Sequence, residues 1–158
     1  MLGIAVLSTA LLAPVAHAQQ GFQRFASLLV DLPSWKASKA DGMALEVAGS
    51  SMVTATRTYK RGDAKVTASV LTGPPAQGAL AAANSGFKIE TPEMHMTTST
   101  IDGMQVTKTY TNSAKSGALL VALGGDAVFM FAYSGIDEDE AMGLAKTFDW
   151  KAIQAQAK

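Results

Sequence analysis

The chain has 158 residues, with 13 basic side chains against 13 acidic ones and no cysteine. Its balanced charge creates no long-range field that would draw it to nucleic acid or to an anionic membrane, so we expect neither as a partner. The lack of cysteine excludes disulfides, thiol catalysis, zinc–thiolate sites and a lipid-anchored cysteine.

The first 18 residues are apolar from Leu2 to Ala16 and end in Ala16-His17-Ala18, the small-x-small pattern that signal peptidase recognises. We therefore predict a cleavable signal peptide over residues 1–18 and export to the bacterial periplasm or beyond. Residues 19–158 are long enough for one domain with a single substantial core. The apolar run is short for a membrane span, so no integral membrane segment is expected after cleavage.

The predicted domain begins with a helix from Gln20 to Leu32, because apolar residues recur there at helical spacing until Pro33. A short strand is expected from Ala44 to Val47. The stretch MVTATRTYKRGDAKVTASVL then predicts a hairpin, since two alternating β-branched runs flank a Lys-Arg-Gly-Asp turn. Alternation in the second run predicts one buried face and one partly wet face.

Residues 76–83 are rich in alanine and predict a second helix after the Gly-Pro-Pro break. Two further hairpins are expected, the first around Asp102-Gly103, which supplies the positive φ of a type I′ turn, and the second around Gly124-Gly125-Asp126. Their strands are predicted over residues 94–101, 104–111, 118–123 and 128–133.

The last helix is expected to open at Asp137, with Glu140 three residues later as its capping-box partner. A helical tail around Trp150 and Ile153 follows. This order of elements predicts an α+β domain, in which an antiparallel sheet of about six to seven strands, built from hairpins, has helices packed on it.

The run STIDGMQVTKTYTNSAKSGALLVALGGDAVFMFAYSGIDEDEAMGLAKTFDW resembles the C-terminal half of the PsbP-like α/β/α sandwich, with its Ile-Asp-Gly turn, long hairpin, aromatic strand and closing helix. The segments LPSWKASKADGM and RTYKRGD also resemble small exported bacterial proteins of no assigned activity. The resemblance covers most of residues 28–153 and rests on turns and core positions. Because PsbP-like domains are mainly accessory or binding modules, it implies a non-enzymatic role without a cofactor, and it transfers no functional residue.

Met94, His95 and Met96 form the one cluster that suits a soft metal, since thioether and imidazole ligands bind Cu(I). If the turn at residues 102–103 pairs Ile101 with Met104, then His95 lies opposite Tyr110, on the other face of the strand from the two methionines. A shared copper site then requires residues 90–96 to form a loop. Packing methionines are the competing interpretation.

Enzyme motifs are weak in this sequence, which contains neither GxSxG nor a phosphate-binding glycine loop. His95 is the single histidine after residue 18, and Ser85-Gly86-Phe87-Lys88 matches SxxK without its companion motifs. The Arg-Gly-Asp tripeptide is explained by its turn, and the acidic run at residues 137–140 by the dipole of the helix it opens. We therefore expect no enzymatic activity.

The sequence favours a non-catalytic, exported accessory or binding protein, with a soft-metal (copper) binding protein as the alternative. Arg57, Tyr59 and Lys60 are the candidate partner-binding residues, because a cation beside a tyrosine makes a contact point. The partner is expected to be an unknown protein or a small apolar ligand. The aromatic residues are numerous enough for a ligand pocket between sheet and helix, and equally for an ordinary core; they are Trp35, Tyr59, Phe87, Tyr110, Phe129, Phe131, Tyr133 and Trp150.

Overall fold

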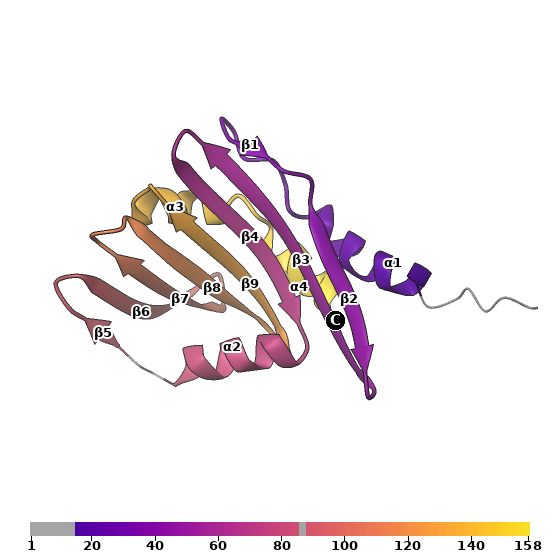
Figure 1. Cartoon of the computed structure of the whole chain (residues 1–158). Coiled ribbons are helices and arrows are strands. Elements are labelled where there is room, and N and C mark those ends of the chain that lie inside the picture. Colours follow the sequence, from indigo (N-terminus) through magenta and orange to yellow (C-terminus); the bar gives the residue numbers. More distant parts are fainter. Residues whose placement is uncertain (1–14, 86–87) are drawn as a thin grey trace, which may run out of the picture.

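A computed structural model describes residues 15–85 and 88–158, which form a nine-stranded antiparallel sheet and four helices (Figure 1). The predicted α+β class is therefore confirmed. Most of the predicted signal peptide, residues 1–14, lies outside the described residues. Within the described ranges, no helix combines the length and the apolar character needed to cross a membrane.

The first half of the chain supplies one helix and four strands. They are α1 (Val15–Ala26), β1 (Lys36–Ala37), β2 (Asp41–Val47), β3 (Ser50–Arg61) and β4 (Ala64–Thr72). The predicted hairpin is the β3–β4 pair, whose strands meet at Arg61 and Ala64 around Gly62. The predicted first helix, Gln20–Leu32, was placed too late in the chain, because α1 runs from Val15 to Ala26 and the chain then continues in turns to Trp35.

The second half supplies the other three helices and five strands. They are α2 (Pro74–Asn84), β5 (Ile89–Glu90), β6 (Met94–Ile101), β7 (Met104–Thr111), β8 (Ser116–Gly124), β9 (Ala127–Ser134), α3 (Glu138–Ala145) and α4 (Trp150–Ala157). Both later hairpins are confirmed as β6–β7 and β8–β9. The strand count exceeds the predicted six to seven because β1 and β5 have only two residues each.

The strands follow the order β1-β3-β4-β9-β8-β7-β6-β5, and β2 also pairs with β3. Successive hairpins account for this order except at two places: β1 pairs with β3 and not with β2, and at the centre β4 pairs with β9 and joins the two halves of the chain. The long strand β3 carries β2 along residues 50–56 and β1 at residues 59–60, beyond the end of β2.

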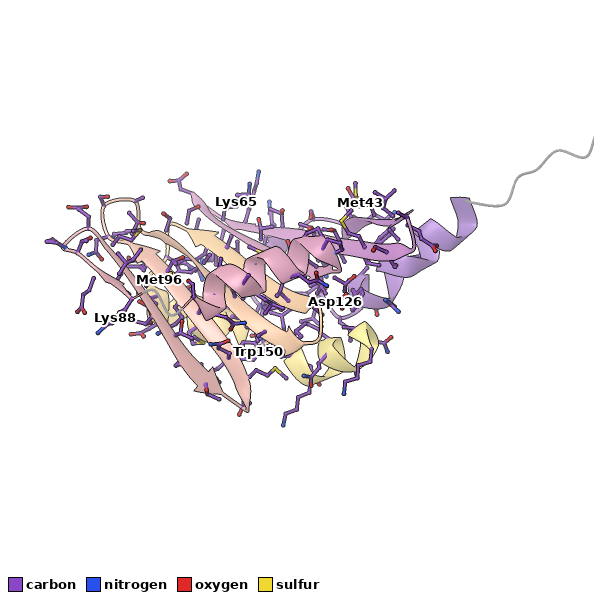
Figure 2. All side chains as sticks on the ribbon, turned by 90° about the horizontal axis from the view of Figure 1, so that it is seen from below. Met43, Lys65, Lys88, Met96, Asp126 and Trp150 are labelled. Atoms are coloured by element: carbon purple, nitrogen blue, oxygen red, sulfur yellow. The ribbon has the colours of Figure 1, made fainter. Side chains whose placement is uncertain are left out.

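The core lies on one side of the sheet, here called the helix face, against which α1, α3 and α4 pack. Alternate residues of the central strands point to it, so Val66, Ala68 and Val70 are buried while Thr67 and Ser69 point to the opposite, open face. Figure 2 shows Lys65 and Met43 on the open side and Trp150 on the side of α4. Helix α2 runs along one end of the sheet (Figure 1) and buries Ala76 and Ala83.

Candidate functional site

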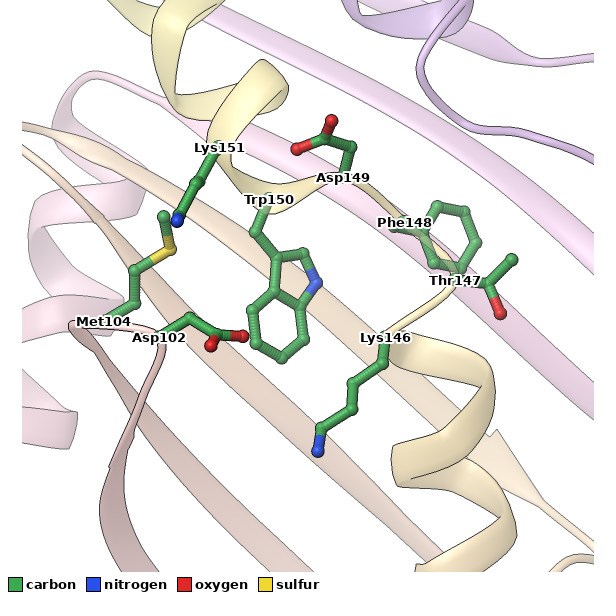
Figure 3. A pocket seen from close by; sticks show the side chains of 8 residues that line it. All are labelled: Asp102, Met104, Lys146, Thr147, Phe148, Asp149, Trp150 and Lys151. Carbon is green, nitrogen blue, oxygen red and sulfur yellow. The ribbon is translucent and has the colours of Figure 1, made fainter.

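A cleft of about 440 Å³ opens between the β6–β7 turn and the connection from α3 to α4 (Figure 3). Asp102 and Met104 line it from the turn, and residues 146–151 line it from the connection and the first turn of α4. The cleft therefore lies where the end of the sheet meets the helices, a common place for ligand sites.

Local sequence explains both walls of the cleft. Asp102 and Gly103 adopt positive φ angles of 52° and 80°, which is the backbone a tight hairpin turn requires. On the other wall, Asp149 accepts a hydrogen bond from the Ala152 amide at 2.9 Å and starts α4 at Trp150. The hairpin turn thus positions Asp102 on one wall, and the helix cap at Asp149 positions the indole of Trp150 on the other.

The indole of Trp150 forms the apolar floor of the cleft. It is only 5% exposed and packs against Phe129, with the ring centroids 6.4 Å apart. Its Nε1 has no hydrogen-bond partner among the described residues. A buried donor without a partner is uncommon in folded proteins, so this wall has an unused polar group.

Charged side chains surround this indole. Lys146 and Lys151 lie on opposite sides of it, and the carboxylate of Asp102 lies beside the ring (Figure 3). Within residues 15–85 and 88–158, neither lysine has an ion-pair partner. Asp149 lines the cleft as well as capping α4, so the lining contains two lysines and two aspartates. The cleft can receive a small molecule with a flat apolar body and an anionic group.

A second polar cluster lies on the helix face near the start of α3, where Glu138 contacts His95 and Lys108. One carboxylate oxygen of Glu138 is 2.5 Å from His95 Nε2, and the other is 2.5 Å from Lys108 Nζ. Partial burial acts to raise the pKa of the Glu138 carboxyl, but the hydrogen bonds and charges of Lys108 and His95 together lower it. The cluster ties α3 to β6 and β7.

Two tyrosines continue this cluster toward the core. Tyr110 lies between His95 and Tyr133, with ring centroids 5.6 and 6.3 Å away. The Tyr133 side chain is 4% exposed, and burial raises the pKa of its hydroxyl. Gly117 makes room for it, because a Cβ at that position would lie 2.5 Å from the hydroxyl oxygen. Tyr133 is therefore a closely packed side chain with a neutral hydroxyl.

The predicted copper ligands do not converge. Met96 pairs with Thr109 and His95 with Tyr110, in the register that the sequence predicts for strands. The two methionines therefore point to the open face, whereas His95 points to the helix face and binds Glu138. The described residues also contain no group of three or more His, Cys, Asp or Glu side chains that could hold a metal ion. The strand geometry removes the loop that a shared copper site would need.

The predicted partner-binding residues do not form one surface either. Tyr59 is 0% exposed, donates to the Val30 carbonyl at 2.7 Å, and has a pKa that burial raises to about 12. Arg57 lies over its ring and donates to the carbonyls of Leu29 and Ser38 at 2.6 and 2.9 Å. Only Lys60 is exposed, on the open face. Arg57 and Tyr59 therefore hold the segment after α1 against β3.

Sequence reasoning missed the charged rim of the cleft and included Trp150 only as one of many aromatics. The available signal was local, since Lys146 and Lys151 flank the Phe-Asp-Trp sequence that caps and starts α4. The approach of Asp102 from a distant turn has no such signal.

Comparison of the chain with family models, curated proteins and solved structures found no match. The resemblance to PsbP-like domains therefore stays a prediction from the sequence.

Proposed function

We propose that this protein is a non-catalytic, exported binding protein, and that the Trp150 cleft binds a small organic anion with a flat apolar body. The observation that carries the proposal is the pairing of a buried indole floor with two lysines that have no ion-pair partner in the described part of the chain. A flat ligand that covers the small exposed part of the indole places a carboxylate between the two ammonium groups.

The proposed class of ligand follows from the charges around the floor. Lys146 and Lys151 attract an anion, and Asp102 and Asp149 oppose a second negative group. A monoanion is therefore expected to bind better than its neutral analogue or a dianion.

A pair of matched probes tests the proposal. The fluorescence of Trp150 is measured during titration with 2-naphthoate and with its neutral amide, in a Trp35→Phe background that leaves one tryptophan. We expect the naphthoate to bind at least about tenfold more tightly than the amide, equivalent to about 1.4 kcal/mol.

Variants of the cleft distinguish binding at this site from nonspecific binding elsewhere on the protein. Lys146→Ala/Lys151→Ala is expected to abolish the preference for the anion, while the matched control Lys60→Ala/Lys65→Ala, on exposed lysines of the open face, keeps it. Equal affinity of both probes for the unmodified cleft, or equal loss in both double variants, contradicts the proposal.

Export has its own test. Expression in a bacterium, followed by the intact mass of the purified protein, is expected to give a chain that begins at Gln19. A full-length chain recovered from the cytoplasm contradicts this part of the proposal and leaves the cleft untouched.

A further inference from the structure

Strand β2 presents an apolar edge to solvent. In the described part of the chain, the exposed large hydrophobic residues are Val30, Met43 and Leu45, and the last two belong to β2 at 58% and 48% exposure. Edge strands are normally protected by charge, proline or shortness, because their free backbone groups pair with other chains. Strand β2 has seven residues and no proline; it carries charge at Asp41 and Glu46, but both side chains that point to the open face between them, Met43 and Leu45, are apolar.

The direction of the backbone groups of β2 follows from its partner strand. The Val53 amide donates to Thr72 Oγ1 at 3.0 Å, on the β4 side, and Val53 lies opposite Ala44. The peptide groups of Ala44 therefore point away from β3, and alternation points those of Gly42 and Glu46 the same way. Consistently, the Gly42 amide donates not to β3 but to Asp41 Oδ1, at 2.8 Å.

We propose that β2 pairs antiparallel with β2 of a second copy of this chain, across a two-fold axis at Ala44. This register places Ala44 opposite its own copy and Gly42 opposite Glu46, with two backbone hydrogen bonds at each pair. The Gly42 amide exchanges its bond to Asp41 for one to the partner strand. Centring on Ala44, the midpoint of the strand, uses every outward-facing peptide group of β2.

The pattern of β2 is self-complementary, which favours a second copy over another partner. In this register Met43 lies opposite Leu45 of the other copy on the open face, so each exposed apolar side chain covers another. Glu46 faces glycine, and no like charges oppose each other. Because the axis is perpendicular to the sheet, the helix faces of both copies lie on the same side of a continuous sheet.

The dimer is expected to be weak. Pairing of one short strand buries less surface than a stable interface of about 1,200–2,000 Å². A dissociation constant in the micromolar range, about −8 kcal/mol, is therefore expected.

Sedimentation velocity over a concentration series tests the pairing. The chain is expected to pass from monomer to dimer, and Met43→Lys/Leu45→Lys, which sets lysines opposite each other, to weaken the dimer at least about tenfold. The control Thr98→Lys/Thr100→Lys adds the same charges to exposed residues of the opposite edge and is expected to dimerise like the wild type. A monomer at every soluble concentration, assemblies larger than dimers, or equal weakening in both variants overturns the proposal.

Cross-linking tests the register. The chain has no cysteine, so Met43→Cys and Leu45→Cys chains can be prepared separately, mixed and oxidised. The proposal predicts that the mixture forms a disulfide dimer at least about fivefold faster than either chain alone, since only the mixture places two thiols directly opposite. Equal rates in the mixture and in the single chains overturn the register. Circular dichroism of each variant confirms that it is folded.

Discussion

The two edges of the sheet are built on different chemistry. At one edge β2 carries exposed Met43 and Leu45, whereas at the other edge β6 carries exposed Thr98, Ser99 and Thr100 beyond the short strand β5. Hydroxyl side chains keep an edge hydrated, while apolar side chains favour a partner. The comparison sets an edge that exposes hydroxyl side chains against an edge that exposes two apolar side chains.

The elements behind the two edges are also held differently. On the β2 side, α1 packs on Gly42 through Phe22, and Arg57 bonds to two backbone carbonyls; its ion pair with Asp31 is exposed to solvent and contributes little. On the β6 side, α3 is held by the ion pairs of Glu138 with His95 and Lys108. Packing and backbone bonds do not depend on pH, whereas an ion pair does. Substitutions on the β2 side are therefore expected to lower the free energy of unfolding more than substitutions on the β6 side. The effect of substitutions on the β6 side is expected to depend on pH.

The largest effect is expected from Gly42→Ala. A Cβ at Gly42 would lie 2.2 Å from the Thr54 carbonyl oxygen and 2.8 Å from Phe22 Cγ, so α1 or β2 must shift. We expect the free energy of unfolding to fall by about 3 kcal/mol in urea denaturation. Gly78→Ala in α2, where a Cβ meets open space, is the control and is expected to gain about 0.5–1 kcal/mol. A neutral result at Gly42 would show that α1 adapts freely.

A smaller loss is expected from Arg57→Ala. The substitution removes three hydrogen bonds, to Leu29, Ser38 and Asp31, and we expect urea denaturation to show a loss of about 2 kcal/mol. Arg57→Lys keeps the positive charge but loses the planar guanidinium that donates to several acceptors at once, so it is expected to recover less than half of that loss. Full recovery by lysine would show that charge, not the bonds to the backbone, holds this side.

The smallest effect is expected from Glu138→Gln, which should lower the free energy of unfolding by about 1 kcal/mol at pH 7. The fold lowers the pKa of this carboxyl below its ordinary value of 4.5. Its contribution to stability is therefore present above that value and disappears as the pH falls through the lower, folded-state pKa.

Urea denaturation from pH 7 down to pH 3 checks this prediction, and the difference between wild type and Glu138→Gln is expected to shrink as the pH falls. Glu90→Gln is the control at the same edge, because Glu90 is exposed and pairs only with exposed Lys88. A difference between wild type and Glu138→Gln that persists unchanged at pH 3 would remove the ion pairs as its cause.

The sequence predicted the hairpins because their signals are local. Asp102-Gly103 allowed one turn geometry, and the register counted outward from it is the one observed. The capping prediction was also right in part, since Asp137 accepts from the Glu140 amide at 2.8 Å. The Glu140 side chain, however, pairs with Arg61 on the distant β3–β4 turn. No periodic pattern in the sequence indicates tertiary contacts of this kind.

The candidate site was less predictable than the fold. Its walls come from residues 102–104 and 146–151, and their meeting depends on how the closing helices lie on the sheet. The prediction at Arg57 met the same limit, because residue type alone did not show that the carbonyls of Leu29 and Ser38 accept its hydrogen bonds. Residue type indicated chemistry, but only the packing decided whether that chemistry was already used.

The central β4–β9 pairing divides the assembly of the chain into early and late steps. Every other long pairing joins strands that follow one another along the chain, so those hairpins close short loops at little entropic cost. Residues 65–72, in contrast, find their partners only when residues 127–134 are available. During synthesis, β3 and β4 therefore wait with one unpaired edge until β9 emerges, and this long-range closure is expected to limit the folding rate.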